Sequence, residues 1–351
     1  MIFIFILLGI FATLAWRDLK LALVLLMGLL PTYLIRFNIG PIPTTALEAM
    51  ILICVGVWII RHHGWHIDLR SIGPTWLRPI LLFLAAACFA VVVSPNTFAA
   101  LGVWKAYFIE PILVYLMLRA MFQDNADWQR AITALFISAC VISLGSIFQR
   151  LTGLGIPPPW DIEGRATSLF DFPNAVGLFL APIVAFAIVS IRRGIGQVTG
   201  QPLRRVAMIT AVFGIVAIVY SQTEAAFIAI PAGLLLTYLI SGANKKNKLI
   251  AFISCIAVAG ILFASVPVVR EKLLLQDTSG LARRNIWHET ITMLRDHPIF
   301  GAGLSGFPTV ISDYHDATFY EIFQYPHNII LNIWVELGLL GLMAVGWLGW
   351  S

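Results

Sequence analysis

The sequence has few charged residues and no cysteine pattern that suggests pairing. Charged side chains make up 12% of the 351 residues, against roughly 25% in a typical soluble domain. The four cysteines all lie in apolar stretches, with no CxxC or Cys/His spacing, so neither disulfides nor a structural zinc site is expected. No basic run is longer than the short one at 245–248. Nucleic-acid binding is therefore not expected either.

Apolar residues are abundant instead. They form 59% of the chain, and the mean hydropathy is +0.88. A soluble globule cannot bury that much apolar surface, so the composition predicts a polytopic membrane protein. A helix that spans a bilayer needs about 20 apolar residues. We expect an all-α, polytopic transmembrane helical bundle of about 11 spans, near 2–15 (a span, not a cleaved signal), 21–35, 44–60, 79–93, 98–118, 131–149, 174–191, 206–220, 224–240, 249–266 and 328–349.

The charge of the connecting loops predicts the orientation. Lysine and arginine are concentrated in the loops at 16–20, 61–78, 119–130, 192–205 and 241–248, whereas the alternate short loops hold only Arg36, Arg150 and Arg165. Because positive loops face the cytoplasm, the N-terminus is expected outside and the C-terminus inside. The chain then divides into ten spans over 1–266, a large extracytoplasmic segment over 267–327 and a last span over 328–351. The segment 150–173 is also expected outside.

The segment 267–327 is polar enough to form a small cap with its own helix. Ser279 is a candidate N-cap for a helix from about Leu281 to Arg295, ended by Pro298. At i,i+4 spacing, Arg283 shares a helix face with Trp287, and Arg284 with His288. A glycine-rich turn follows at 301–307. It lacks both the GxGxxG spacing and the preceding strand of a dinucleotide-binding loop, so that interpretation is rejected.

Three arginines of the outer segments are candidate anion ligands. The guanidinium groups of Arg165, Arg283 and Arg284 offer a fixed fork of donors that suits phosphate or pyrophosphate oxygens. From spacing alone, solvated loop charge or contact with lipid headgroups is the preferred explanation. His327 follows Pro326 at the outer end of the last span, where its imidazole is expected at the mouth of the bundle. His315 with Asp313 and Asp316 is a weaker candidate for a cation site, and solvated loop polarity is preferred there.

Four stretches, in this order, resemble the O-antigen ligase / O-antigen polymerase family of bacterial membrane glycosyltransferases. The first is Arg165 followed by the Pro-Asn pair at 173–174, and the second is Ser221 to Glu224 with the alanines after it. The third runs from Arg283-Arg284 to the glycine-rich turn, and the fourth from Pro326-His327-Asn328 to Gly341. Together they cover roughly 160–345. The third and fourth in tandem are the more specific.

The resemblance implies transfer of a glycan from an undecaprenyl-pyrophosphate donor to an acceptor hydroxyl, at the extracytoplasmic face of the bacterial inner (plasma) membrane. The acceptor is a glycan, a lipid core or a protein. The reaction is expected to be inverting and to need no metal or other cofactor. The fold is expected to be similar to that of membrane-embedded C-type glycosyltransferases. By family position the catalytic residues are His327, Arg284 and Arg283, and the substrate-binding residues are Arg165, Asn174, Glu224, Asn328 and Trp287.

Other interpretations stay open. Relatives place an arginine near Ser221 where this chain has Glu224, which suggests another role for that carboxylate, such as acceptor binding. A polymerase of the same family differs from a ligase only in its acceptor. A transporter or flippase would use the intramembrane charges Glu48, Lys105 and Glu110. It is disfavoured because no inverted repeat is visible and the arginines lie in outer loops. A membrane partner without activity is the third class.

Overall fold

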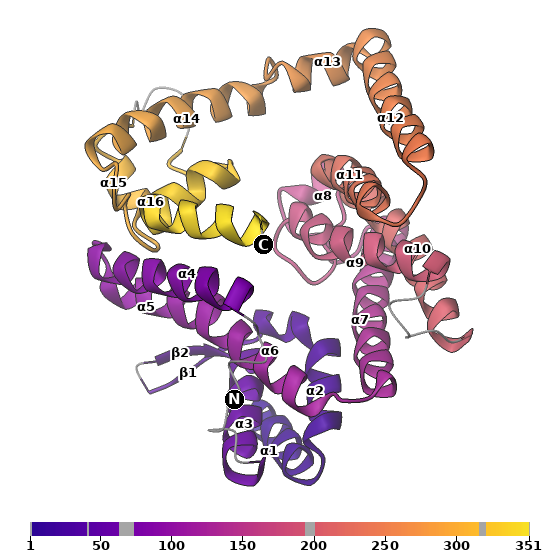
Figure 1. Ribbon diagram of the computed structural model, residues 1–351, viewed down its shortest axis with the longest axis vertical. Coiled ribbons are helices and arrows are strands. Elements are labelled where there is room, and N and C mark those ends of the chain that lie inside the picture. The colour runs from indigo at the N-terminus through magenta and orange to yellow at the C-terminus, as the bar shows by residue number, and fades with distance from the viewer. Residues whose placement is uncertain (1, 41, 63–73, 194–200, 316–320, 351) are drawn as a thin grey trace. The chain divides into compact units, whose positions relative to one another are not determined.

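The computed structural model describes residues 2–40, 42–62, 74–193, 201–315 and 321–350 (Figure 1). The chain forms two compact units, each built from two stretches of sequence. The first unit comprises Met1–Gly64 and Leu116–Ser254, and the second comprises Trp65–Tyr115 and Cys255–Ser351. Helices α6 (Glu110–Met121) and α12 (Lys245–Ser265) each run from one unit into the other.

The eleven predicted apolar segments all coincide with helical chain, which confirms an all-α polytopic fold. Among the described residues, seven helical stretches are long and apolar enough to cross a membrane: Thr75–Val93, Thr97–Met121, Asn125–Thr152, Pro173–Ile191, Gln201–Ser221, Lys245–Ser265 and Ile329–Trp350. The other four segments lie on the shorter helices α1 (Ile2–Arg17), α2 (Leu19–Gly28), α3 (Ala46–His62) and α11 (Glu224–Ile240).

The second segment is shorter than predicted. Helix α2 ends at Gly28 and is followed by a 3-10 turn, η1 (Leu30–Leu34), which contains Pro31. The chain then forms a small antiparallel hairpin from β1 (Arg36–Ile39) and β2 (Ile42–Thr45), with Phe37 opposite Thr44. Sequence reasoning missed this hairpin because the turn glycine Gly40, with φ of +59°, is flanked by strands too short to show an alternating pattern.

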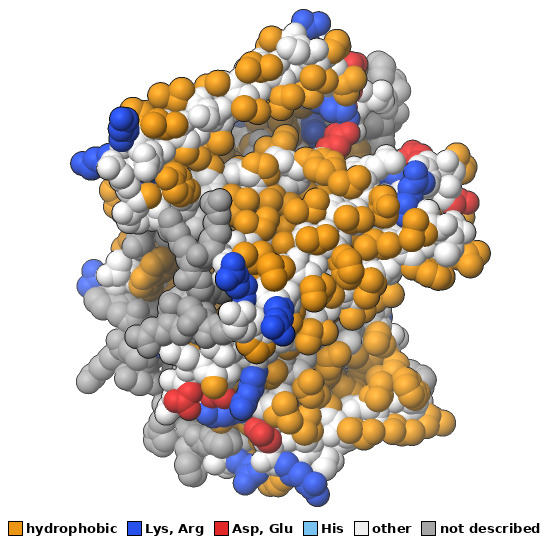
Figure 2. Space-filling model, turned by 90° about the vertical axis from the view of Figure 1, so that its right-hand side faces the viewer, with side chains coloured by type: hydrophobic (Ala, Val, Ile, Leu, Met, Phe, Trp, Pro, Cys, Tyr) orange, Lys and Arg blue, Asp and Glu red, His pale blue; other side chains and the backbone are white. Residues whose placement is uncertain are grey.

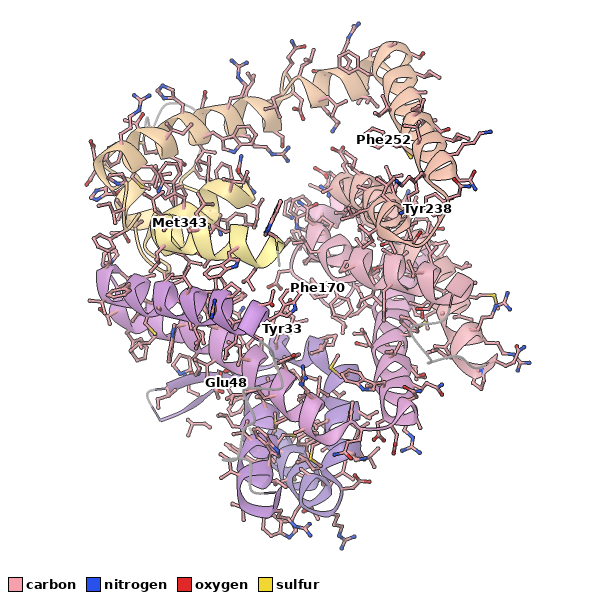
Figure 3. The ribbon with its side chains drawn as sticks, in the orientation of Figure 1. Tyr33, Glu48, Phe170, Tyr238, Phe252 and Met343 are labelled. Atoms are coloured by element: carbon pink, nitrogen blue, oxygen red, sulfur yellow. The ribbon has the colours of Figure 1, made fainter. Side chains whose placement is uncertain are left out.

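The core of the first unit lies between α7 (Asn125–Thr152), α9 (Pro173–Arg193) and α10 (Gln201–Ser221). Buried apolar side chains from these three helices form one cluster, which includes Phe136, Val176 and Ile218. Phe170, labelled in Figure 3, belongs to the same cluster and attaches the loop before α9 to it. The short helix α8 (Trp160–Glu163) and α11 complete this end of the unit.

The second unit is built around α16 (Ile329–Trp350) and α4 (Pro74–Val93). Next to α4 runs one continuous helical stretch made of α5 (Thr97–Trp104), a π-helical turn at Lys105–Ile109 and α6. The wide turn comes just before Pro111, which has no N–H to donate to the preceding turn. The outer segment holds α13 (Pro267–Leu273), α14 (Thr278–Asp296) and α15 (Phe307–Ile311).

The glycine-rich turn is built into a break in α16. At Gly338 the backbone leaves the helical region, with φ of +67° and ψ of −171°. The Val335 carbonyl accepts from the Ala302 N–H at 2.7 Å, and the Leu339 N–H donates to the Ile299 carbonyl at 2.9 Å. These two bonds replace the helical bond between residues 335 and 339 and keep both groups paired, as a broken membrane helix requires. The turn at 301–307 is therefore a structural element of the unit.

The helices expose large apolar side chains, as lipid-facing helices do. On α9, Leu178 is 70% exposed while its neighbours Val176 and Leu180 are fully buried. Figure 2 shows hydrophobic side chains over much of one face of the molecule. Surfaces of this kind are covered by lipid in a membrane protein, so the pattern agrees with the predicted spans.

Candidate functional site

Arg165 lies at the centre of a hydrogen-bonded group in the first unit. Its Nε donates to the Ser221 carbonyl at 3.1 Å, and its Nη2 donates to Asn174 Oδ1 at 3.1 Å and to the Gln222 carbonyl at 3.4 Å. The indole of Trp160 lies 5.2 Å from the guanidinium carbon. Nη1 is left with one neighbour, the exposed carboxylate of Glu163 at 3.7 Å. The Nε/Nη2 edge of the guanidinium is thus committed to hydrogen bonds with the protein, and Nη1 is paired with an exposed carboxylate.

Two helix N-termini lie beside this arginine. Asn174 is in the first turn of α9, and the turn at Ser221–Thr223 leads directly into α11, whose first residue is Glu224. Thr223 Oγ1 donates to the Pro173 carbonyl at 3.1 Å and so joins the two helix starts. The first turn of a helix presents unpaired N–H groups and the positive end of its dipole, and both favour an anion. The predicted residues Arg165, Asn174 and Glu224 are therefore brought together at one end of the first unit.

Gln149 fixes the loop that carries Arg165, and sequence reasoning missed it. This side chain is only 5% exposed. Its Oε1 accepts from the N–H groups of Thr167 and Ser168 at 2.9 and 2.7 Å, and its Nε2 donates to the carbonyls of Gly155 and Ser168 at 2.8 and 2.9 Å. A lone glutamine near the end of a helix carries no motif, so nothing in the sequence pointed to this role.

The second group lies in the segment 267–328 of the second unit and begins with α14. The N-cap of this helix is Asp277, whose side chain accepts from the Gly280 N–H at 3.0 Å. The predicted cap at Ser279 is therefore wrong, because Asp277, two residues earlier, supplies the capping acceptor. The face of α14 that carries Ile286 and Met293 packs on α15 and α16, while Arg283 and Arg284 remain exposed.

Trp287 and Asn328 hold the chain on either side of His327. The Trp287 Nε1–H donates to the Pro326 carbonyl at 2.8 Å. Asn328 caps α16, because its Oδ1 accepts from the N–H groups of Ile330 and Leu331 at 3.0 and 3.2 Å. This confirms the predicted helix start at Pro326–Asn328. His327 itself has φ of +52°, a conformation that costs a non-glycine residue about 1–3 kcal/mol and persists where its surroundings enforce it.

The environment of His327 keeps its imidazole neutral. The ring reaches the surface but is flanked by Phe323, with ring centroids 5.0 Å apart, and by Tyr325, at 4.6 Å. Partial burial lowers the pKa of His327 below its ordinary value of 6.5, and the positive charge of Arg283 lowers it further. An imidazole that is neutral at pH 7 can accept a proton.

Within the described part of the chain, His315 pairs with one acid, Glu289 of α14. Its Nδ1 lies 3.3 Å from Glu289 Oε2, and both side chains are largely buried. Asp316 lies outside the described residues. Among the residues that the structure describes, no group of three or more His, Cys, Asp or Glu side chains is placed to hold a metal ion. The predicted independence from metal stays a prediction.

Most of the predicted site residues thus fall into two groups. Arg165, Asn174 and Glu224 belong to the first unit, and Arg283, Trp287, His327 and Asn328 to the second. Arg284 is on the same helix turn as Arg283 and is exposed like it. Phe323 and Tyr325, which flank the histidine, come from a stretch of the segment 267–327 in which the sequence analysis nominated neither residue.

The comparisons with known proteins agree with the resemblance seen in the sequence. A family model described as O-Antigen ligase matches residues 209–346. This range includes the turn at Ser221–Glu224 and the whole second group, and it begins after Arg165. A search of the curated proteins and a search of the solved structures gave no match. The family match supports action on lipid-linked glycans in general, as a ligase or a polymerase, and the apolar helices indicate a membrane protein. Over residues 209–346, the chain is therefore similar to the O-antigen ligase family.

Proposed function

We propose that this protein transfers a glycan from a polyprenyl-pyrophosphate donor, expected to be undecaprenyl pyrophosphate, to an acceptor hydroxyl at the extracytoplasmic face of the inner membrane. The acceptor oxygen attacks the anomeric carbon, and the bond from that carbon to the pyrophosphate breaks with inversion. The hydroxyl loses its proton, and the lipid pyrophosphate leaves with the bonding electrons. The protein then has two tasks, to receive the proton and to stabilise the growing negative charge.

His327 is suited to the first task. A neutral imidazole between two aromatic rings can accept the hydroxyl proton or hydrogen-bond the incoming acceptor. A nearby positive charge stops the histidine from being protonated before the reaction, and Arg283 supplies that charge. The position of His327 between two aromatic rings, with the chain on either side held by the Trp287–Pro326 bond and by the Asn328 cap, is the single observation that carries the proposal.

The arginines are suited to the second task. Donors that are already oriented stabilise a developing anion most strongly where water is excluded. Arg283, whose charge lowers the pKa of His327, is proposed to contact the pyrophosphate, and Arg284 is proposed as the lesser contributor. Arg165 is oriented by three bonds to the protein, next to two helix starts. It is proposed as a substrate-binding residue of the first unit.

Glycan transfer in proteoliposomes tests the proposal. The donor would be an undecaprenyl-pyrophosphate oligosaccharide, offered with and without a lipid-core acceptor and with a chelator present. Each of Arg165→Ala, Arg283→Ala and His327→Ala is expected to slow transfer about a hundredfold or more, the usual loss on removing one transition-state donor. Arg295→Ala removes an exposed arginine from the last turn of the same helix α14 and is the matched control, with transfer unchanged.

The products distinguish the two kinds of transferase. A glycan joined to the lipid core identifies a ligase, whereas a ladder of longer lipid-linked glycans without core identifies a polymerase. Loss of transfer on chelation contradicts metal independence. A folded protein that transfers nothing to either acceptor, but moves the lipid-linked glycan across the bilayer, would replace the proposal with a flippase.

A further inference from the structure

We propose that Trp287 is a positioning residue that sets the orientation of the His327 imidazole through a hydrogen bond to the Pro326 carbonyl. The link to catalysis rests on the proposed function, but the effect on the histidine does not depend on it. By family position, Trp287 was predicted to bind substrate. The structure supports a different use of this side chain.

The Pro326 carbonyl and the His327 N–H belong to the same rigid peptide group. A hydrogen bond to that carbonyl therefore fixes the plane of the peptide group that leads into His327. Trp287 donates this bond, at 2.8 Å, from a different element, α14. On the other side, Asn328 is held by its cap of α16. His327 thus lies between two anchored peptide groups, which explains how it keeps a left-handed φ of +52°.

The same tryptophan connects the histidine to Arg283. Arg283 and Trp287 are separated by one helical turn and lie on one face of α14. A helix that is anchored to Pro326 through Trp287 therefore holds the Arg283 charge at a fixed place beside the imidazole. Pro326 is buried, and Trp287 packs against the cluster around Ile286 and Phe307. Both partners of the bond are thus immobilised by packing.

The chain offers a matched control in Trp334. Its Nε1–H donates to the Pro298 carbonyl at 2.7 Å, so Trp334→Phe removes the same kind of bond, between indole and prolyl carbonyl, in the same unit. That bond has no contact with His327. A general loosening of the unit would act in both variants, whereas loss of positioning would act only in Trp287→Phe.

The test is the pKa of His327, read by NMR from ring-labelled histidine in the full-length protein. The chain has seven histidines, and the signal that disappears in His327→Gln gives the assignment. In Trp287→Phe we expect the pKa of His327 to rise toward 6.5, because the ring moves into water and away from Arg283. In transfer assays we expect kcat to fall about tenfold or more, as misplacement of a reacting group does, with KM for the donor within twofold of wild type. In Trp334→Phe, the pKa of His327 and kcat should both stay at the wild-type value.

An unchanged pKa of His327 in Trp287→Phe overturns the proposal, and so does an equal rise in both variants. If Trp287→Phe does not fold, benzothienylalanine at 287 keeps the fused rings and lacks only the N–H, and the same outcomes apply. The proposed function fails separately, when the wild type transfers no glycan. In that case a selective rise of the pKa still shows that Trp287 positions the histidine.

Discussion

Replacing Gln149 is expected to release the outer loop that carries Arg165. One amide side chain here satisfies two backbone N–H groups and two backbone carbonyls. In Gln149→Leu the N–H groups of Thr167 and Ser168 lose their acceptor in a buried site, at about 1–3 kcal/mol each. The expected loss is therefore about 2–6 kcal/mol for the two N–H groups together. The unpaired carbonyls add to it.

The loss should be both global and local. Thermal unfolding of the detergent-solubilised protein should move to lower temperature, and hydrogen–deuterium exchange should accelerate at 165–170 before other parts of the first unit. Gln201→Leu, at an exposed position at the start of α10, is the control that adds the same apolar side chain without these bonds. Wild-type stability and wild-type protection at 165–170 in Gln149→Leu would refute the reasoning.

The near-isosteric variant Gln149→Glu gives a sharper test because its effect depends on pH. In the variant, one carboxylate oxygen can still accept from the N–H groups of Thr167 and Ser168. The other oxygen would face the carbonyls of Gly155 and Ser168, which in the wild type accept hydrogen bonds from the Gln149 amide. The folded state should therefore raise the pKa of the introduced carboxyl, so that stability is present at low pH and is lost as pH rises through that raised pKa. Stability that instead increases with pH would contradict the assigned bonding.

Three further predictions follow from the second unit. Gly338→Ala should cost at least about 1–3 kcal/mol, because φ of +67° strains any other residue and its Cβ would meet the Ile299 carbonyl; Gly346→Ala, with open space around it, should leave the melting temperature unchanged. Because the pKa of His327 is below 6.5, transfer should decline only as pH falls below that value, and Arg283→Ala should move the decline to higher pH, whereas Arg284→Ala should not. Asp277→Ala should destabilise α14 by about 1 kcal/mol, and Ser279→Ala should not, as thermal unfolding would show.

Much of the architecture was accessible from residue types alone. The bilayer requires long apolar runs and a closed set of backbone hydrogen bonds, so helical segments were predictable from Ile2 to Trp350. The start of α16 was predictable as well, because Asn just before an apolar helix commonly acts as its N-cap. The shortened α2 was not, since a stretch of apolar residues does not show where a helix changes to a 3-10 turn.

In the candidate site, too, some features were predictable from the sequence and others required the structure. Arg165, Arg283 and His327 are chemically distinctive residues in stretches that resemble a known family, so the sequence nominated them before any geometry was seen. Which arginine acts on the histidine depends on the rotation of α14, which is set by the burial of its Ile286 face. The use of Gln149 and of the Trp287 N–H depends on carbonyls from residues that are distant in the sequence. Residue chemistry and local pattern therefore determined the spans and the reactive groups, while the pairing of donors with acceptors far apart in the chain was decided only by tertiary packing, because hydrogen bonds form between neighbours in space.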